Sequence, residues 1–327
     1  MGTSVSGKNA NSYGRTTLVA IYLGIDGGGS KTSCLIGDET CVLGAGTGAA
    51  SNVVRVGEAQ ARESLTTAIR QACRVANIEP SQISRVCVGL AGAARPEISD
   101  LVRGLVSETL SGEIKLAEIE IVGDMVIALE AAFGSGPGVI VIAGTGSIAY
   151  GRNSKGQTAR AGGWGFAISD EGSGHWIGRT AVAAALGAWD ENPGQDVRLI
   201  EVLLRSWHLE TTEQLVPAAN ATPPPDFAAL FPSVLSSAES GDRIACDALT
   251  RAGTHLANLA GTLLRRLFSN SGAVPVAMSG GVFASSPLVR QVFYNTLSSL
   301  HPNAVLNPSV IEPVRGALAL ARKGAAK

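Results

Sequence analysis

The sequence predicts an α/β protein that is built from two similar lobes. Three observations support this prediction. The chain has 327 residues, enough for two domains at about 150 residues each. Its apolar segments alternate between short runs of strand length and longer runs with helical spacing. A strand that ends in a glycine-rich turn occurs twice, at Ile25–Ser30 and Ile142–Ser147, with four of six positions identical and a constant offset of 117 residues.

The first half of the chain begins with antiparallel strands and continues with parallel crossovers. Leu18–Ile25 is an apolar strand that leads into Asp26 and three glycines. The order β-β-β-α-β-α-β-α predicts one mixed α/β unit. The elements expected after the first strand are strands Lys31–Ile36 and Thr40–Leu43, helix Gly57–Ala76, strand Ser84–Leu90, helix Pro96–Leu110, strand Ile119–Val122 and helix Met125–Phe133.

The pattern then begins again and becomes mainly helical. The expected elements are strands Val139–Ala143, Ser147–Arg152 and Gln157–Ala161, helices Ile177–Leu186, Leu199–Ser206 and Ile244–Phe268, strand Val274–Met278 and helix Val314–Lys323. We therefore divide the chain into a flexible tail at 1–17, an N-terminal lobe at 18–135 and a C-terminal lobe at 136–327. A duplicated α/β unit has a cleft between its halves, where ligands usually bind.

Composition and charge exclude several functions. The 26 basic and 27 acidic residues give a net charge of −1, so no global attraction to nucleic acid or to an anionic membrane is expected. The five cysteines and four histidines lack the spacing of a zinc or iron–sulfur site. No apolar run is long enough for a signal core or a membrane span. An odd number of cysteines without a secretory signal favours a cytoplasmic location.

The two glycine-rich turns are candidate phosphate-binding loops, because glycine lets several backbone N–H groups approach one phosphate. The alternative is that they are ordinary hairpin turns. A Walker A loop is excluded because Ser30 precedes Lys31 and a strand follows. The Gly-x-Gly-x-x-Ala patterns at Gly44–Ala49 and Gly144–Ala149 do not lead directly into a helix, which argues against a dinucleotide fingerprint.

The motifs occur in an order that resembles the actin/hexokinase/Hsp70 superfamily of ATP-dependent phosphotransferases. They are Gly24–Thr32, Gly123-Asp124, Ala143–Ser147 and Ser279–Val282. The segment Gly162–Gly178 looks like the Gly-Gly-Trp-Gly…Asp-Glu-Gly-Ser signature of the N-acetylglucosamine kinase family, which is grouped with the benzoyl-CoA-reductase-activator type of ATPases. The resemblance runs from about residue 22 to about residue 321. It implies two ribonuclease-H-like (actin-like ATPase) lobes, with ATP and sugar in the cleft and the final helix, about 314–323, packed back toward the first lobe.

The resemblance also implies an activity, an ATP-dependent kinase that transfers the γ-phosphate to the 6-hydroxyl of N-acetylglucosamine or a related amino sugar, with Mg²⁺ as the metal. The residues that match the family's ATP-binding positions are Gly27, Gly28, Gly29, Ser30, Lys31, Thr32, Gly144, Thr145, Gly146, Ser147, Gly280 and Gly281. Those that match its sugar-binding positions are Asn52, Asp124, Gly163, Trp164, Gly165 and Asp170.

Two carboxylates carry the chemistry in this interpretation. Asp124 follows a strand and opens a helix, and by resemblance it takes the proton of the attacking sugar hydroxyl. Asp26 is the expected carboxylate near Mg²⁺, acting through water. Structural roles are open for both, because Asp124 could simply cap its helix and Asp26 could stabilise its turn. In the same way, Trp164 could be a core residue and Asp170 a loop cap.

Other functions remain as alternatives. Glucosamine or N-acetylmuramic acid could replace N-acetylglucosamine as the substrate. An ATPase that couples hydrolysis to a protein partner, without a sugar, is the alternative from another class. The oligomeric state is open, with a homodimer as one candidate.

Overall fold

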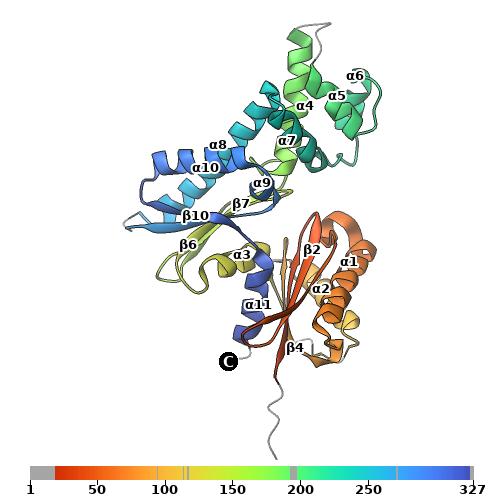
Figure 1. The fold of residues 1–327 in the computed structure, drawn as a ribbon, viewed down its shortest axis with the longest axis vertical. Coiled ribbons are helices and arrows are strands. Elements are labelled where there is room, and N and C mark those ends of the chain that lie inside the picture. Colours follow the sequence, from red (N-terminus) through yellow and green to blue (C-terminus); the bar gives the residue numbers. More distant parts are fainter. Residues whose placement is uncertain are drawn as a thin grey trace, which may run out of the picture.

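The computed structural model describes residues 19–93, 95–112, 114–115, 118–191, 197–269 and 272–324. The tail expected at 1–17 lies outside the described residues. The chain forms two five-stranded sheets, each covered by helices and placed one above the other in Figure 1. The predicted α/β fold with two ribonuclease-H-like lobes is confirmed.

The first sheet has the strand order β3-β2-β1-β4-β5. Strand β1 runs antiparallel to β2 and parallel to β4, and β4 runs parallel to β5. Helices α1 and α2 pack on one face of this sheet. These elements are β1 (Ile21–Gly27), β2 (Lys31–Gly37), β3 (Val42–Ala49), α1 (Val53–Ala76), β4 (Ile83–Leu90), α2 (Pro96–Thr109) and β5 (Ile119–Gly123).

The second sheet repeats this topology. Its order is β10-β9-β6-β7-β8, with β6 antiparallel to β7 and parallel to β9, and β9 parallel to β10. Each strand therefore has a counterpart in the first sheet, as the repeated glycine-rich turn predicts. The strands are β6 (Gly138–Ala143), β7 (Ser147–Arg152), β8 (Thr158–Gly162), β9 (Val274–Ser279) and β10 (Ala304–Ile311).

Strand β3 is longer than predicted and lies further along the chain than Thr40–Leu43. Its three glycines, Gly44, Gly46 and Gly48, face α1, where an added Cβ would overlap the helix backbone. The glycines let α1 approach the edge of the sheet closely. The Gly-x-Gly-x-x-Ala pattern at Gly44–Ala49 is thus part of a strand that packs on a helix, which agrees with its rejection as a dinucleotide fingerprint.

The sequence interpretation missed β10 and the helix before it. Strand β10 contains Asn307 and Pro308, and its pairing with β9 shifts register between Leu306 and Val310. It lies at the edge of the sheet, where proline is tolerated because no neighbour needs its missing N–H. The same proline weakens the sequence signal for a strand.

Helices form most of the C-terminal lobe and share one large core with the second sheet. The green and cyan helices in Figure 1 extend this lobe away from the first sheet. They are α4 (Gly174–Glu191), α5 (Arg198–Ser206), α6 (Thr212–Ala219), the 3₁₀ helix η3 (Phe227–Leu230), α7 (Phe231–Glu239), α8 (Arg243–Leu267), α9 (Gly281–Ser285) and α10 (Pro287–Leu300). None of the helices in the described part combines the length and apolar character needed to cross a bilayer.

Two helices connect the lobes. Helix α11 (Pro313–Gly324) follows the second sheet but packs on the first, where Ala317 and Leu318 meet Tyr22 of β1 and Ile127 of α3 (Asp124–Phe133). Figure 1 shows α11 beside the strands of the first lobe. Helix α3 also contacts the second sheet, because Leu129 packs against it. With helices on both faces, β1 is almost fully buried, which explains its continuous apolar sequence.

Candidate active site

The carboxyl ends of β1, β4 and β5 meet at one edge of the first sheet. Gly27 of β1 lies opposite Leu90 of β4, and Leu90 lies opposite Gly123 of β5. Because these strands are parallel, Asp26 and Asp124 come to the same edge. The structure therefore brings together the two carboxylates that the sequence assigned to the chemistry.

The electrostatics of this pair are unfavourable without a ligand. Burial raises the pKa of Asp26 to about 6, with a further increase from the charge of Asp124 and an opposing effect from Lys31. Burial also raises the pKa of Asp124, although a backbone hydrogen bond from Met125 opposes this. Each carboxylate is thus costly to ionise, and a cation or a donated hydrogen bond would relieve that cost.

These carboxylates fit a magnesium ion that arrives with a nucleotide. Among the residues that the structure describes, no three His, Cys, Asp or Glu side chains form a group that could hold a metal ion. Mg²⁺ bound to phosphate groups needs only one or two protein carboxylates, with water as the remaining ligands. Asp26 supplies such a carboxylate, and neither Asp26 nor Asp124 takes part in an ion pair among the described residues.

Asp124 begins α3, as predicted. Its Oδ1 accepts a hydrogen bond from the Met125 N–H at 2.9 Å. The other backbone donor to this carboxylate is the N–H of Asp124 itself, and no side chain in the described part of the chain donates to Oδ2. One oxygen of the Asp124 carboxylate therefore stabilises the start of the helix, and the other can still accept a proton. The structural and catalytic roles are compatible.

Backbone hydrogen bonds join the first glycine-rich turn to the start of α1. Gly28 donates its N–H to the Lys31 carbonyl at 3.0 Å, and its own carbonyl accepts from the backbone of Ser51 and Asn52, both at 3.2 Å. Asn52 caps α1, because its side-chain oxygen accepts from Val54 N–H at 3.1 Å. Its amide nitrogen has no partner among the described residues, so a sugar contact at Asn52 stays a prediction.

Two hydroxyls of the predicted ATP site make hydrogen bonds within the protein. Thr32 is fully buried, and its Oγ1 lies 2.7 Å from both the Ala49 carbonyl and the Ser51 hydroxyl. Ser147 is buried and donates its hydroxyl to the Glu171 carbonyl at 2.8 Å. These two hydroxyls are therefore not free to contact a phosphate, and the Ser147 N–H already donates to the Asp170 carboxylate.

The second glycine-rich turn is fastened to α4. The Gly144 carbonyl accepts from Gly174 N–H at 2.8 Å, and the Thr145 carbonyl accepts from His175 N–H at 3.3 Å. Both turns are therefore held through their carbonyl oxygens by the start of a helix. The N–H groups of Gly28 and Gly144 donate within their own turns, so the backbone donors left for an anion are those of Gly29 and Ser30 in the first turn and of Thr145 and Gly146 in the second.

Gly280 and Gly281 lie beside the second turn. Gly280 follows β9, which is paired with β6, and it has a φ of 98°. A Cβ at Gly280 would overlap the backbone of Ala143, so only glycine fits here. The backbone after β9 thus passes directly against the end of β6, where the nucleotide is expected.

Asp170 lies under the second turn. A Cβ at Gly146 would be 2.8 Å from its Oδ2, and its Oδ1 is buried without a hydrogen-bond partner. Burial raises the pKa of Asp170, whereas hydrogen bonds from the backbone of Ser147 and Gly165 lower it. Asp170 therefore stabilises the loop and still presents one unsatisfied acceptor, which a ligand hydroxyl or amide could satisfy.

Trp164 is on the surface, so the alternative of a core tryptophan is wrong. Its side chain is 64% exposed, and the neighbouring Ile168 is 80% exposed. The guanidinium group of Arg160 stacks over the ring at 3.9 Å from its centre. Gly163 and Gly165 flank it in this exposed loop. A sugar contact by these three residues stays a prediction.

The two lobes contact each other at the glycine-rich turns. The Ser30 hydroxyl lies 2.9 Å from the Thr145 hydroxyl. Beside them, Arg55 Nη2 on the first turn of α1 lies 2.7 Å from Asp226 Oδ2, just before η3. Sequence reasoning missed this ion pair. The only signal for Arg55 is its position three residues after the cap Asn52, and nothing local marks Asp226 as its partner.

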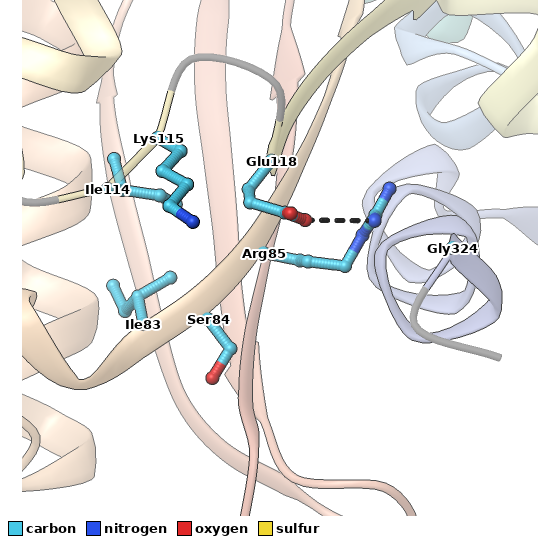
Figure 2. Close-up of a pocket in the computed structure, with 7 residues that line it drawn as sticks. All are labelled: Ile83, Ser84, Arg85, Ile114, Lys115, Glu118 and Gly324. Atoms are coloured by element: carbon cyan, nitrogen blue, oxygen red, sulfur yellow. Dashed lines mark hydrogen bonds and ion pairs between the residues drawn. The ribbon is translucent and has the colours of Figure 1, made fainter. Parts of the chain in front are cut away.

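A separate hollow lies away from these residues. It is bordered by Arg85, whose guanidinium lies 2.9 Å from the Glu118 carboxylate, and by the end of α11 at Gly324 (Figure 2). Its other lining residues are Ile83, Ser84, Ile114 and Lys115. It adjoins the amino-terminal end of β4, opposite to the edge that carries Asp26 and Asp124. None of the predicted site residues line it.

Comparisons with known proteins agree with the sequence resemblance. The family model of the BadF/BadG/BcrA/BcrD ATPase family matches residues 23–321. The chain is 30% identical over 314 residues to N-acetyl-D-glucosamine kinase of Dictyostelium discoideum, covering 92% of this chain and 97% of that protein. It is 31% identical over 308 residues to an N-acetylmuramic acid/N-acetylglucosamine kinase of Clostridium acetobutylicum, with the same coverage.

Solved structures show the same architecture. A Chromobacterium violaceum protein, provisionally named an N-acetylglucosamine kinase, is 26% identical with a TM-score of 0.69, and the match covers 93% of this chain and 99% of that one. A ROK family glucokinase from Streptomyces griseus has a TM-score of 0.60 at 17% identity, with 93% and 100% of the chains covered. The second similarity concerns the fold alone.

Proposed function

The chain belongs to the BadF/BadG/BcrA/BcrD ATPase family, and from this premise we propose that it is an ATP-dependent kinase of N-acetylglucosamine or a related amino sugar. The resemblance noted in the sequence is thereby confirmed at the level of the family. The relatives named above as amino-sugar kinases match over 92% of this chain, which supports the same reaction class here.

One observation carries the proposal. Asp26 and Asp124 lie at the same sheet edge, and the two glycine-rich turns meet beside them through the Ser30–Thr145 contact. A kinase needs this combination, with backbone donors for the phosphates and a carboxylate that can accept the proton of an attacking hydroxyl. In this proposal ATP lies between the lobes 18–135 and 136–327, on backbone N–H groups of both turns and beside Gly280 and Gly281.

The reaction is a displacement at phosphorus. The 6-hydroxyl oxygen of the sugar bonds to the γ-phosphorus while the bond from that phosphorus to the β–γ bridging oxygen breaks. The electron pair of the broken bond leaves with ADP, and the hydroxyl proton moves to Asp124 Oδ2. Asp26 would hold Mg²⁺ through water, and bound Mg²⁺ supplies neutralisation of the charge on the phosphate oxygens. Lys31, which lowers the pKa of Asp26, helps to keep that carboxylate ionised.

In this proposal the sugar binds to polar groups that have no hydrogen-bond partner within the described part of the protein. Asp170 Oδ1 and the Asn52 amide nitrogen would bind sugar hydroxyls or the acetamido group. The exposed Trp164 ring, with Gly163 and Gly165 on either side, would cover an apolar face of the sugar. These contacts favour an N-acetylated sugar over glucose, because only the former offers an amide to the polar groups.

The test is turnover with a panel of sugars. Purified protein with Mg²⁺ and ATP should release ADP with N-acetylglucosamine, glucosamine or N-acetylmuramic acid, and mass spectrometry should find a phosphorylated sugar. Calorimetry should show tighter binding of N-acetylglucosamine than of glucose. ATP hydrolysis that is independent of every sugar would instead support an ATPase that acts with a protein partner.

The role of Asp124 has its own test. Asp124→Asn keeps the oxygen that accepts from Met125 N–H, and asparagine is about as good at a helix terminus as aspartate. Loss of the base should lower kcat by about 10²–10⁴-fold while ATP and sugar still bind. If the variant keeps more than about a tenth of wild-type kcat with chemistry rate-limiting, Asp124 is not the base and Asp170 becomes the candidate.

A further inference from the structure

We propose that Arg55 is a further catalytic residue, which exchanges Asp226 for oxygens of the γ-phosphate when ATP binds. This inference rests on the proposed kinase function, because it places the phosphates at the two glycine-rich turns. It assigns to the phosphates of ATP a second cation, in addition to Lys31 at the end of the first turn.

The position of Arg55 is the first argument. A Cβ built on Gly29 of the first turn would lie 3.3 Å from Arg55 Nη1 and 3.4 Å from Thr145 Oγ1 of the second turn. The guanidinium group therefore lies where the two turns meet. A phosphate that bridges the turns would come within reach of its N–H donors.

The present partner of Arg55 is the second argument. Asp226 Oδ2 accepts from Arg55 Nη2 at 2.7 Å, and its other oxygen caps η3 by accepting from Ala228 N–H at 3.1 Å. The Arg55 side chain is 30% exposed and that of Asp226 is 49% exposed. An ion pair with this exposure changes an equilibrium constant by only about fivefold or less. Asp226 can therefore be released at little cost, and its remaining hydrogen bond keeps it in place.

The chemistry of the transfer explains why a cation is useful at this point. As the bond between the γ-phosphorus and the bridging oxygen breaks, its electron pair moves to ADP and negative charge is spread over the phosphate oxygens. Arginine stays charged and offers a planar set of N–H donors that matches two phosphate oxygens. In the ligand-free protein, Asp226 holds this group beside the turns.

A purely structural role predicts a different outcome. If the ion pair only holds the lobes together, loss of either partner should have the same effect on ATP binding and turnover. If Arg55 is shared between Asp226 and phosphate, the two substitutions should act in opposite directions. Asp226→Asn would then free Arg55 for ATP, whereas Arg55→Ala would remove the contact.

The experiment measures kcat, KM and nucleotide affinity for four variants. Arg55→Ala should lower kcat about 10²-fold, as expected for loss of one preorganised donor to a developing charge. Arg55→Lys should recover part of this loss. Asp226→Asn should lower the KM for ATP about two- to fivefold, and this effect should disappear in the Arg55→Ala background. Arg55→Ala should weaken binding of a non-hydrolysable ATP analogue and leave ADP binding unchanged, because ADP lacks the γ-phosphate.

Arg62→Ala is the matched control, since Arg62 lies on the same helix and pairs with Glu58 and Glu108 away from the turns. Its kcat and KM should stay within twofold of wild type. The proposal is overturned if Arg55→Ala keeps more than a third of wild-type kcat, or if it weakens ADP and the ATP analogue equally. Weaker ATP binding by Asp226→Asn would show that the pair only holds the lobes. Failure of the kinase function itself is distinct, because the wild-type protein would then phosphorylate no sugar.

Discussion

Replacing Asp26 with asparagine should stabilise the ligand-free fold. The pKa of Asp26 is raised from 3.8 to about 6 in the folded protein, so ionisation is less favourable there than in the unfolded chain. At pH 7.5 this difference corresponds to about 3 kcal/mol, at roughly 1.4 kcal/mol per pKa unit. Because Asp26 is not completely buried, we expect a gain of about 1–3 kcal/mol from Asp26→Asn.

The pH dependence has a defined sign. A carboxyl group with a raised pKa destabilises the fold when it is ionised, so its cost grows as the pH rises from about 4 to about 6 and is complete above that range. The stabilisation by Asp26→Asn should therefore be largest at pH 7.5 and fall to about half at pH 5.0. The same variant should lose most phosphate transfer, because the proposed Mg²⁺ partner is gone.

Urea unfolding without nucleotide and metal, at both pH values, measures this effect. Asp247→Asn is the control, because Asp247 is an exposed carboxylate whose nearest cation, Arg251, is 3.8 Å away. Its free energy of unfolding should change by less than about 0.5 kcal/mol. If Asp26→Asn is no more stable than wild type at pH 7.5, or if its gain is equal at the two pH values, the argument from a buried charge is refuted.

Three further outcomes are expected. Gly46→Ala should lower the free energy of unfolding by about 1–3 kcal/mol, because its Cβ would overlap the Ala68 carbonyl of α1; an unchanged urea midpoint would contradict the close packing. Gly144→Val should keep the melting temperature, since no atom lies within 4 Å of its Cβ site, while calorimetry shows at least tenfold weaker ATP binding; equal affinity would make this an ordinary hairpin turn. EDTA should abolish phosphate transfer without abolishing sugar binding, and transfer that persists would exclude the proposed role of Mg²⁺.

The sequence alone determined the elements that local patterns specify. The apolar strand before each glycine-rich turn, the helix that begins at Asp124 and the repetition at an offset of 117 residues are all visible in short segments. The repetition predicted two lobes, and the structure has two sheets of matching strand order. Local signals sufficed here because hydrophobic period and turn composition act over a few residues.

Strands β3 and β10 show where local patterns fail. The glycines of β3 are unfavourable in a strand by propensity, yet they are required because α1 packs against their backbone. The proline of β10 is accepted because the strand lies at an edge. In both cases a neighbour that is distant in sequence decides which residues the strand tolerates.

The candidate site likewise has some features that the sequence predicted and others that only the structure revealed. The sequence identified Asp26, Asp124 and both glycine-rich turns, because each lies at the end of a recognisable strand. Only the tertiary structure showed that the Thr32 hydroxyl is buried and bonded to Ser51, that Trp164 is exposed, and that Arg55 forms an ion pair with Asp226. The last contact joins the start of α1 to the residue before η3, so it depends on how the two lobes are placed relative to each other. No short segment encodes that placement, because it results from the sum of many contacts across the interface between the lobes.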